Sequence, residues 1–296
     1  MGNHEYDRFN RRKSNNGRSI ESIFFHSLLI STLLVAFFSA TERSQRIDSQ
    51  MLERSDAIVA TISREILSGL TRIDIFGETD SRIGECSGTT TRKTQLSGGA
   101  MYTTLTVGHC IKNIISGQTS VKLSNQDTNI PIHAEPVMCE EYKAAPFEDN
   151  IALCSFITME DHPGIDSLPP QKLNPGYVWQ KGDMFTTLGF PGQLNPPSQY
   201  PAVIYTDIGT ISNISRSALL SGNTNKVGCG EYELYNGQSG GPQIYDNLIV
   251  AVNSSGCIGY PELASDAGVD LPHDYYEFEE QFVQASLNLV DDILTR

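Results

Sequence analysis

From residue 76 onward the chain consists of short β-rich runs separated by turns, and this texture most constrains its fold. Runs such as YTTLTV, NIALCSF and NLIVAV follow one another at short intervals, punctuated by Gly, Pro, Asn and Asp. The chain then closes with residues 275–295, where Phe278, Phe282 and Leu289 mark one apolar face of a helix. Parallel strands would need helical crossovers between them. The pattern therefore predicts an antiparallel barrel or sandwich followed by a helix.

A second feature is an apolar segment near the amino terminus. Residues 23–40 are mostly apolar or small, and they follow a leader, residues 1–21, that carries five basic side chains. This run lies at the lower length limit for a bilayer span and exceeds the usual apolar core of a signal peptide. Ala40 suits signal cleavage whereas Phe38 does not, so residues 22–40 are either a removed signal peptide or a retained membrane anchor. Both alternatives predict a secreted or otherwise exported protein.

All cysteines lie beyond this segment, which predicts disulfides formed in an oxidising compartment. The spacing alone does not choose among the possible pairings. The sequence has no CxxC pair to suggest zinc or redox chemistry, and we expect no metal and no organic cofactor. The six residues are Cys86, Cys110, Cys139, Cys154, Cys229 and Cys257.

The chain between the apolar segment and the β-rich region forms a separate part, residues 41–75. It is polar at first and then amphipathic, with Met51, Ile58 and Ile62 at spacings typical of a helix. We interpret it as a stem or pro-segment in front of a folded domain that spans residues 76–296.

The charge balance excludes one class of partner. The chain has 21 basic and 35 acidic residues and a formal charge of -14. An acidic surface repels the phosphate groups of nucleic acids. We therefore expect no nucleic-acid partner.

The sharpest local signal is the stretch NGQSGGP, residues 236–242. An attacking serine needs an exposed hydroxyl, and the small residues on either side of Ser239 leave it accessible. The backbone N–H groups of Gly237 and Ser239 can then point at one carbonyl oxygen and form an oxyanion hole. The stretch predicts a nucleophilic serine, which needs a base to accept its proton.

His109 is the candidate for this base. It sits at the end of the strand-like run TTLTVGHC, and its neighbour Cys110 offers a covalent tether to Cys86 in the run ECSGT, a plausible opposite strand. Such a bridge would hold the imidazole in place. Three other histidines lie in Pro-flanked segments and are interpreted as surface residues: His133, His162 and His273.

Together these motifs resemble the trypsin/chymotrypsin-fold serine proteases over about residues 84–296. VGHC, NIALC and GQSGGP stand, in the family's order, for the motifs of its histidine, aspartate and serine. The resemblance implies a serine endopeptidase that hydrolyses a polypeptide substrate through His109, Asp149 and Ser239. It implies an all-β fold of two antiparallel six-stranded β-barrels with the site between them, preceded here by the hydrophobic N-terminal helix and followed by the C-terminal helix.

The resemblance also bears on the disulfides. It implies that Cys229 and Cys257 form a bridge that braces the specificity pocket. Cys139 and Cys154 are then left to pair with each other, a bridge that has no place in the general family pattern.

The acid position departs from the family pattern. The family's aspartate directly precedes Ile-Ala-Leu, whereas here Asn150 stands between Asp149 and Ile151. We assign the role to Asp149 and keep Asn150 as the alternative. The difference matters because an asparagine can hold the imidazole in the wrong tautomer.

A second departure precedes the serine. Gln238 stands where trypsin-like zymogens carry an aspartate that pairs with a newly cut amino terminus. A neutral amide cannot form this ion pair, so we expect no activation by terminus insertion. Together with the run TTLGFPG, residues 186–192, this feature is similar to glutamyl-endopeptidase-like and bacterial-type members.

Specificity is less clearly encoded. Glu233 lies near the position of the pocket-floor carboxylate of trypsin-like enzymes and would then select Arg or Lys; its other interpretation is an exposed loop acid. Asn253 and Ser254 lie in the strand that would line the substrate groove. Glutamyl specificity would want a histidine in that strand, so we do not predict it.

One alternative function belongs to a different class. A catalytically impaired homologue could use the same fold to bind a protein partner, and the departure at the acid position supports this interpretation. The retained Ser239 and His109 favour the enzyme, although acyl transfer to a non-peptide ester would need the same residues. The sequence gives no oligomeric state.

Overall fold

The structure is a computed structural model, and it describes most of the chain beyond residue 46. The apolar segment 22–40 lies outside the described residues, as do Asp149, Asn150, Glu233 and the Cys229–Cys257 pair. Residues from Asp48 onward form one compact unit. In this described part, no helix is both long and apolar enough to cross a bilayer. The described residues are 47, 49–115, 120–142, 151–158, 168, 170–180, 182–210, 214–215, 226–227, 234–254 and 268–295.

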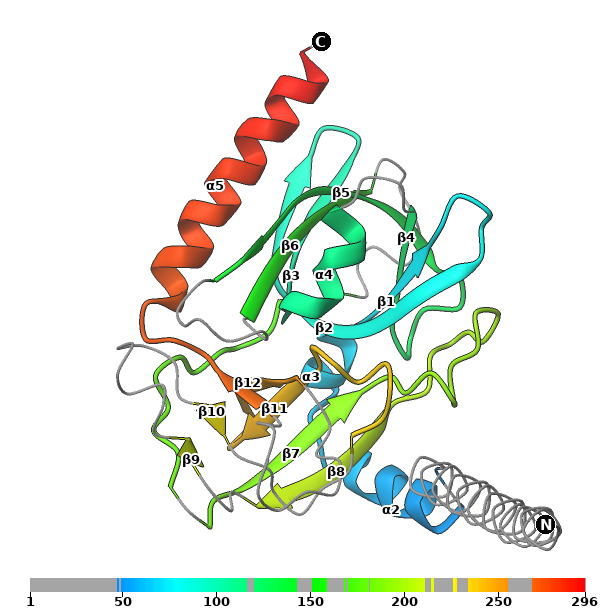
Figure 1. The fold of residues 1–296 in the computed structure, drawn as a ribbon, viewed down its shortest axis with the longest axis vertical. Helices are drawn as coiled ribbons and strands as arrows, with labels where there is room; N and C mark the ends of the chain where they lie inside the picture. Colours follow the sequence, from blue (N-terminus) through cyan, green and yellow to red (C-terminus); the bar gives the residue numbers. More distant parts are fainter. Residues whose placement is uncertain are drawn as a thin grey trace, which may run out of the picture. The chain divides into compact units, whose positions relative to one another are not determined.

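The first half of the unit is a closed antiparallel barrel with the strand order β1-β2-β3-β6-β5-β4 (Figure 1). Every residue of β1, β3 and β6 is buried, because the barrel interior covers one face of these strands and neighbouring elements cover the other. β-branched and aromatic residues make up more than half of β3 and favour its extended form. The strands are β1 (Leu70–Phe76), β2 (Arg82–Leu96), β3 (Gly99–Val107), β4 (Ser120–Ser124), β5 (Ile132–Glu141) and β6 (Ile151–Thr158).

The second half is a sheet with the order β8-β7-β11-β12-β13-β10-β9, antiparallel in each pairing. The expected second six-stranded barrel is therefore only partly confirmed: within the described residues this half is an open, seven-stranded sheet. At one end it terminates in two strands of two residues each, β10 and β9. The strands are β7 (Met184–Gly189), β8 (Tyr205–Thr210), β9 (Ile214–Ser215), β10 (Lys226–Val227), β11 (Pro242–Tyr245), β12 (Leu248–Asn253) and β13 (Gly268–Asp270).

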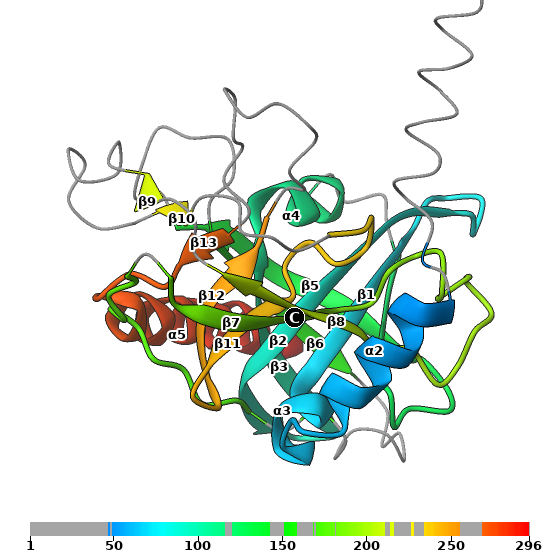
Figure 2. The same cartoon turned by 90° about the horizontal axis from the view of Figure 1, so that it is seen from below.

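A helix, not a strand, covers the β8 edge of this sheet. Helix α2 (Ser49–Val59) lies beside β8 in both ribbon views (Figures 1 and 2). The backbone N–H of Thr206 on β8 donates to the hydroxyl oxygen of Ser55 at 3.0 Å. This contact satisfies an edge donor that would otherwise be free to pair with another strand, which is the physical reason that the sheet ends here.

The amphipathic segment before the barrel forms two helices, where the periodicity predicts one. Ser63 interrupts it by accepting the N–H of Ile66 as the N-cap of α3 (Arg64–Gly69). Strand β1 then begins directly at Leu70 and pairs with both β2 and β4. The barrel thus includes residues 70–75, which the sequence analysis placed in the stem or pro-segment.

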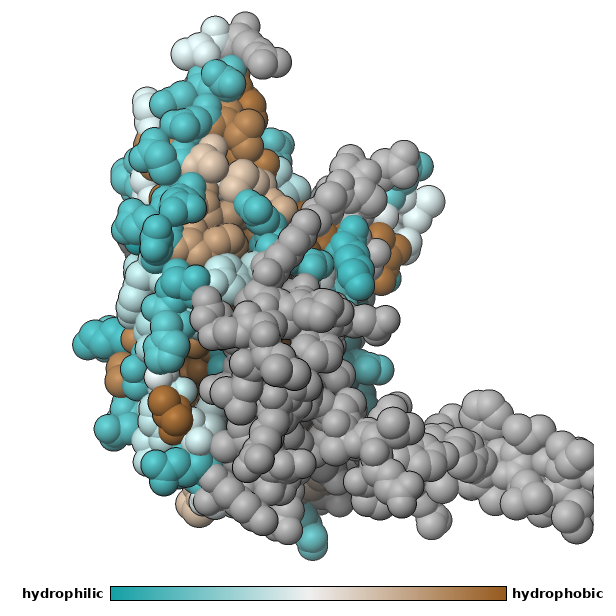
Figure 3. All heavy atoms as spheres, turned by 60° about the vertical axis from the view of Figure 1, so that its left-hand side comes forward, coloured by the Kyte–Doolittle hydropathy of each residue, from teal (hydrophilic) through white to brown (hydrophobic). Residues whose placement is uncertain are grey.

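The predicted C-terminal helix is confirmed as α5 (Tyr275–Leu294), but Leu289, expected on its apolar face, is 41% exposed. Val283 and Val290 pack with Met101 and Ile157 on the outside of the barrel. The buried Ser286 of α5 is hydrogen-bonded to Ser155 on β6, with 2.9 Å between the hydroxyl oxygens. Figure 3 shows apolar surface beside polar surface along this helix.

Candidate active site

His109 lies in the first turn of helix α4 (Gly108–Ile115), directly after the buried strand β3. Its neighbour Cys110 is bonded to Cys86 on β2 with an S–S distance of 2.03 Å, so the predicted tether is confirmed. A ring nitrogen of the half-buried His109 lies within 4.8 Å of both sulfur atoms. Since these sulfurs are bonded to each other, the cluster is a disulfide against an imidazole and not a set of metal ligands.

Ser239 is brought to the same disulfide from the other half of the unit. The Sγ atom of Cys110 lies 3.6 Å from the carbonyl oxygen of Ser239. The disulfide therefore lies close both to the backbone of the predicted nucleophile and to a ring nitrogen of the predicted base.

The backbone of the loop around Ser239 is held at each of its carbonyl groups. Gly237 and Gly240 have φ angles of 96° and 83°, conformations that favour glycine. Four carbonyl oxygens in a row accept hydrogen bonds. Gly192 N–H donates to Asn236 at 2.8 Å, Ser87 Oγ to Gly237 at 2.7 Å, Gly241 N–H to Gln238 at 3.0 Å and Ser87 N–H to Ser239 at 2.8 Å.

Within the described residues, three N–H groups of this loop have no acceptor: those of the exposed Asn236, the buried Gly237 and the half-buried Ser239. The amides of Gln238 and Gly240 donate to backbone oxygens at 3.0 and 2.7 Å. The amides of Gly237 and Ser239 donate to none within the described part of the chain. Folded chains rarely leave buried backbone donors unpaired. The amide of Asn236 is exposed and free to bind water, whereas those of Gly237 and Ser239, on either side of the bonded Gln238, form a pair of donors available to a ligand oxygen.

The hydroxyl of Ser239 donates to the backbone carbonyl of Ser254 at 3.0 Å. Ser254 follows β12, the strand predicted to line the substrate groove, and it is buried. The side chain of Asn253 is occupied within the fold, because its amide donates to Leu188 O at 3.1 Å and its oxygen accepts from Gln243 at 3.2 Å. Of the two groove residues expected from the sequence, Ser254 is the one that contacts the serine hydroxyl.

Ser87 is a site residue that the sequence analysis missed. Its hydroxyl accepts the N–H of Phe190 at 2.8 Å and donates to Gly237, while its own N–H holds Ser239. Ser87 directly follows Cys86, so the disulfide strand also positions the nucleophile loop. Its position next to Cys86 in the run ECSGT is the one sequence feature that points to it. A serine within a strand otherwise carries no pattern showing that it links that strand to another segment.

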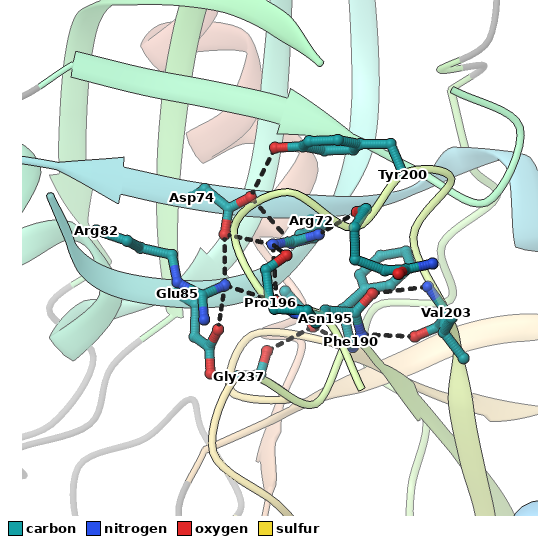
Figure 4. A network of polar contacts seen from close by, with 12 residues as sticks. Arg72, Asp74, Arg82, Glu85, Phe190, Asn195, Pro196, Tyr200, Val203 and Gly237 are labelled. Atoms are coloured by element: carbon teal, nitrogen blue, oxygen red, sulfur yellow. Dashed lines mark hydrogen bonds and ion pairs between the residues drawn. The ribbon is translucent and has the colours of Figure 1, made fainter. Parts of the chain in front are cut away.

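A buried ionic network fixes the two halves of the unit against each other (Figure 4). Arg72 on β1 donates to the carbonyl oxygens of Asn195 and Gln199 at 2.9 and 3.0 Å. Asp74 on the same strand accepts from Arg72 and from Arg82. These charges belong to the barrel, whereas the carbonyl groups belong to the segment that follows β7. The network therefore sets the relative position of the two parts that carry the imidazole and the serine.

Burial and charge act together on Glu85, which lies between this network and the nucleophile loop. Burial raises the pKa of its carboxyl, and Asp74 adds to the effect, whereas Arg82 and Arg72 oppose it. Its Oε2 lies 2.6 Å from Arg82 Nη1. A Cβ added at Gly237 would come within 3.2 Å of its other oxygen, so the carboxylate lies close to the nucleophile loop.

The remaining predictions fall into two groups. The Cys139–Cys154 bridge is confirmed, because these residues oppose each other in the β5–β6 pairing with an S–S distance of 1.98 Å. His133 and His273 are exposed, as expected for surface residues. The assignments of Asp149, Asn150, Glu233 and the Cys229–Cys257 bridge fall outside the described residues.

Comparisons with known proteins address the fold. A sequence model of the trypsin family matches residues 75–276, and no curated protein sequence gives a significant match. The scabies mite inactivated protease paralogue S-I1 is similar with a TM-score of 0.50 and 17% identity, over 75% of this chain and 96% of its own. A Glu endopeptidase is similar with a TM-score of 0.49 and 16% identity, over 74% of this chain and 91% of its own. The Yersinia pestis serine endoprotease is similar with a TM-score of 0.46 and 14% identity, over 76% of this chain and 65% of its own.

Proposed function

The chain belongs to the trypsin family, and we propose that it is a serine endopeptidase in which His109, Asp149 and Ser239 form the catalytic triad. Membership of this family supports a polypeptide substrate. The residues of this chain account for the assignment of roles, because the disulfide Cys86–Cys110 lies against both the imidazole and the backbone of the serine.

The proposed reaction proceeds through an acyl-enzyme. His109 accepts the hydroxyl proton of Ser239 while Oγ attacks the peptide carbonyl carbon, and the N–H groups of Gly237 and Ser239 stabilise the resulting oxyanion. The imidazolium then returns the proton to the leaving amine, and water hydrolyses the ester by the same steps. In the present arrangement the hydroxyl donates to Ser254, so attack requires it to exchange this acceptor for the imidazole.

The single observation that carries the proposal is the pair of unpaired donors at Gly237 and Ser239 within the described chain. A loop that only closed the sheet would use these amides internally, as it uses those of Gln238 and Gly240. Removing one oxyanion donor typically lowers turnover by about 10²- to 10³-fold.

Asp149 is proposed as the residue that orients the imidazole. Ile151, the first residue of β6, lies opposite Val107, the last residue of β3, and Val107 leads directly into helix α4 with His109. Asp149 and Asn150 immediately precede Ile151 in the sequence. Comparing Asp149→Ala with Asn150→Ala tests the choice. Turnover should fall in the Asp149 variant, and wild-type turnover there would transfer the role to Asn150 or to another residue.

A fluorophosphonate probe tests the nucleophile. We expect covalent labelling of Ser239, no labelling of Ser239→Ala, and protection by a peptide aldehyde. Turnover of a peptide library should fall by about 10⁶-fold in the Ser239→Ala and His109→Ala variants. Folded protein that carries no label and cleaves no peptide would favour the alternative, a homologue that binds a protein partner. The library also tests whether Glu233 selects Arg or Lys.

The disulfides and the family are typical of an exported protein. We propose that residues 22–40 direct this export, as a removed signal peptide or as a retained anchor. Mass spectrometry of the mature amino terminus separates the two, since a start before residue 23 would exclude cleavage.

A further inference from the structure

Helix α2 is packed against the second half of the unit through buried contacts. Ser55 has no exposed surface, and its hydroxyl oxygen holds the backbone of β8 at Thr206. On the same helix Arg54 Nη2 lies 3.1 Å from the carboxylate of Asp207. These contacts join a segment upstream of the family's matched region to the sheet that carries the serine loop.

The same helix reaches the serine loop through Tyr235. The Tyr235 hydroxyl donates to the sulfur of Met51 at 3.6 Å, and only 5% of Tyr235 is exposed. Its ring stacks edge-on against Tyr205, the first residue of β8, with centroids 5.2 Å apart. Tyr235 is therefore clamped between the helix and the strand that the helix covers.

Tyr235 in turn holds Gln238, the residue before the nucleophile. The side-chain oxygen of Gln238 accepts the Tyr235 N–H at 2.8 Å, and its side-chain amide donates to Tyr205 O at 3.3 Å. The backbone N–H of Gln238 also donates to Tyr235 O at 3.0 Å. Gln238 is neutral and fully buried, so hydrogen bonds and packing, without an ion pair, fix its position. The two hydrogen-bond partners of its side chain, Tyr235 and Tyr205, both lie near α2. Tyr235 contacts Met51 of the helix, and Tyr205 precedes Thr206, which Ser55 of the helix holds.

We propose that helix α2 is a built-in support that orders the serine loop, and that losing its contact with Tyr235 lowers activity. This inference rests on the proposed function and specifies how the site is held in its active form. It assigns Met51 and Tyr235 as positioning residues. It also assigns the part of the stem or pro-segment that contains α2 a role opposite to that of an inhibitory pro-segment, whose release would raise activity.

The test uses the full chain with single substitutions. Met51→Ala removes the thioether, Tyr235→Phe removes only the hydroxyl, and Met51→Leu restores the packing volume. Glu53→Ala, an exposed position on the same helix, is the matched control. Two quantities are measured: peptide turnover, and amide hydrogen exchange of a peptide spanning residues 234–241, with residues 99–107 of β3 as the internal reference.

In Met51→Ala we expect kcat to fall roughly 10-fold with KM within about twofold, and exchange in residues 234–241 to accelerate by a similar factor while β3 is unchanged. Tyr235→Phe should shift both quantities in the same direction by a smaller factor, and Met51→Leu, which restores the packing but offers no acceptor to the Tyr235 hydroxyl, should recover only part of the loss. Glu53→Ala should resemble the wild type.

The outcomes separate the two proposals. Unchanged exchange and turnover in both Met51→Ala and Tyr235→Phe would overturn the support role, as would a rise in activity. If Met51→Ala does not fold, Tyr235→Phe decides, because it retains the ring. If the wild type cleaves nothing and Ser239 takes no label, but Met51→Ala still accelerates exchange in the loop, the support role stands and the endopeptidase proposal fails.

Discussion

Arg72 and Asp74 lie two residues apart on β1 and form a two-point ion pair, with side chains 1% and 0% exposed. Nε of Arg72 lies 2.9 Å from one carboxylate oxygen and Nη2 lies 3.0 Å from the other. Alternate residues of a strand normally point to the same face, so both charged side chains lie on one face of β1. They are tolerated there because they neutralise each other and because Arg82, Tyr200 and carbonyl groups from the other half add further hydrogen bonds.

The first prediction concerns this pair. In Asp74→Asn the buried Arg72 loses its counter-charge, and breaking a buried pair in this way typically costs about 3–5 kcal/mol of unfolding free energy. Urea denaturation should show a loss of this size. Arg54→Ala removes an exposed pair with Asp207, in which Arg54 is 65% exposed, and should cost about 1 kcal/mol or less. Equal effects of the two substitutions would contradict the role assigned to the network.

The second prediction concerns pH. Burial raises the pKa of Glu85, so the folded chain retains this proton above pH 4.5, where the carboxyl of the unfolded chain loses it. The folded state then binds more protons than the unfolded state, and the free energy of unfolding falls as the pH rises through this window. In Glu85→Gln this decrease should be absent. Urea denaturation of both proteins at several pH values above and below 4.5 measures the difference, and parallel curves would refute the prediction.

The sequence predicted the parts of the site that depend on local chemistry. The run TTLTV followed by Gly-His-Cys indicates a strand that ends at His109, and the structure confirms β3 up to Val107 followed by a helix. The stretch NGQSGGP indicated a loop of small residues around Ser239, and the structure adds that Gly237 and Gly240 have positive φ angles. These features are encoded within a few residues, which is why they can be recognised without a structure.

The sequence did not predict features that depend on contacts between segments far apart in the chain. Strand β1 contains Arg72 and Asp74, whose charges suggest a solvated segment. The carbonyl groups that bind Arg72 lie more than a hundred residues away in the chain. The edge of the second sheet likewise depends on Ser55, which a helical periodicity cannot assign to a strand edge. Ser87 connects the two halves through three hydrogen bonds, and Tyr235 connects the serine loop to helix α2; no local pattern marks such residues.

The third prediction compares the two described disulfides. Removing either bridge by paired Cys→Ser substitution should cost about 3 kcal/mol of unfolding free energy. Only the loss of Cys86–Cys110 should also lower turnover, by about 10- to 100-fold, because this bridge lies against His109 and Ser239. The Cys139–Cys154 bridge joins neighbouring strands of the barrel and serves as the control. Similar turnover of the two variants would contradict a positioning role for Cys86–Cys110.

The final prediction compares two glycines with nearly equal φ angles, Gly237 at 96° and Gly98 at 94°. A side chain is strained at either position, and this alone costs about 1–2 kcal/mol. At Gly98 an added Cβ meets nothing within 4 Å, whereas at Gly237 it would lie 2.5 Å from the carbonyl oxygen of Phe190. Gly237→Ala must therefore move the loop and redirect its N–H, and turnover should fall by about 10²- to 10³-fold.

Gly98→Ala should lose a similar amount of stability from backbone strain and keep its turnover. Measuring kcat and the affinity of a peptide aldehyde for both variants distinguishes a lost oxyanion donor from general destabilisation. The aldehyde forms the tetrahedral adduct whose oxygen the Gly237 amide would bind, so its affinity should fall together with kcat in Gly237→Ala. A variant that keeps full affinity for the aldehyde would show that the unpaired donor at Gly237 is not used in the reaction, and the argument from this loop to catalysis would fail.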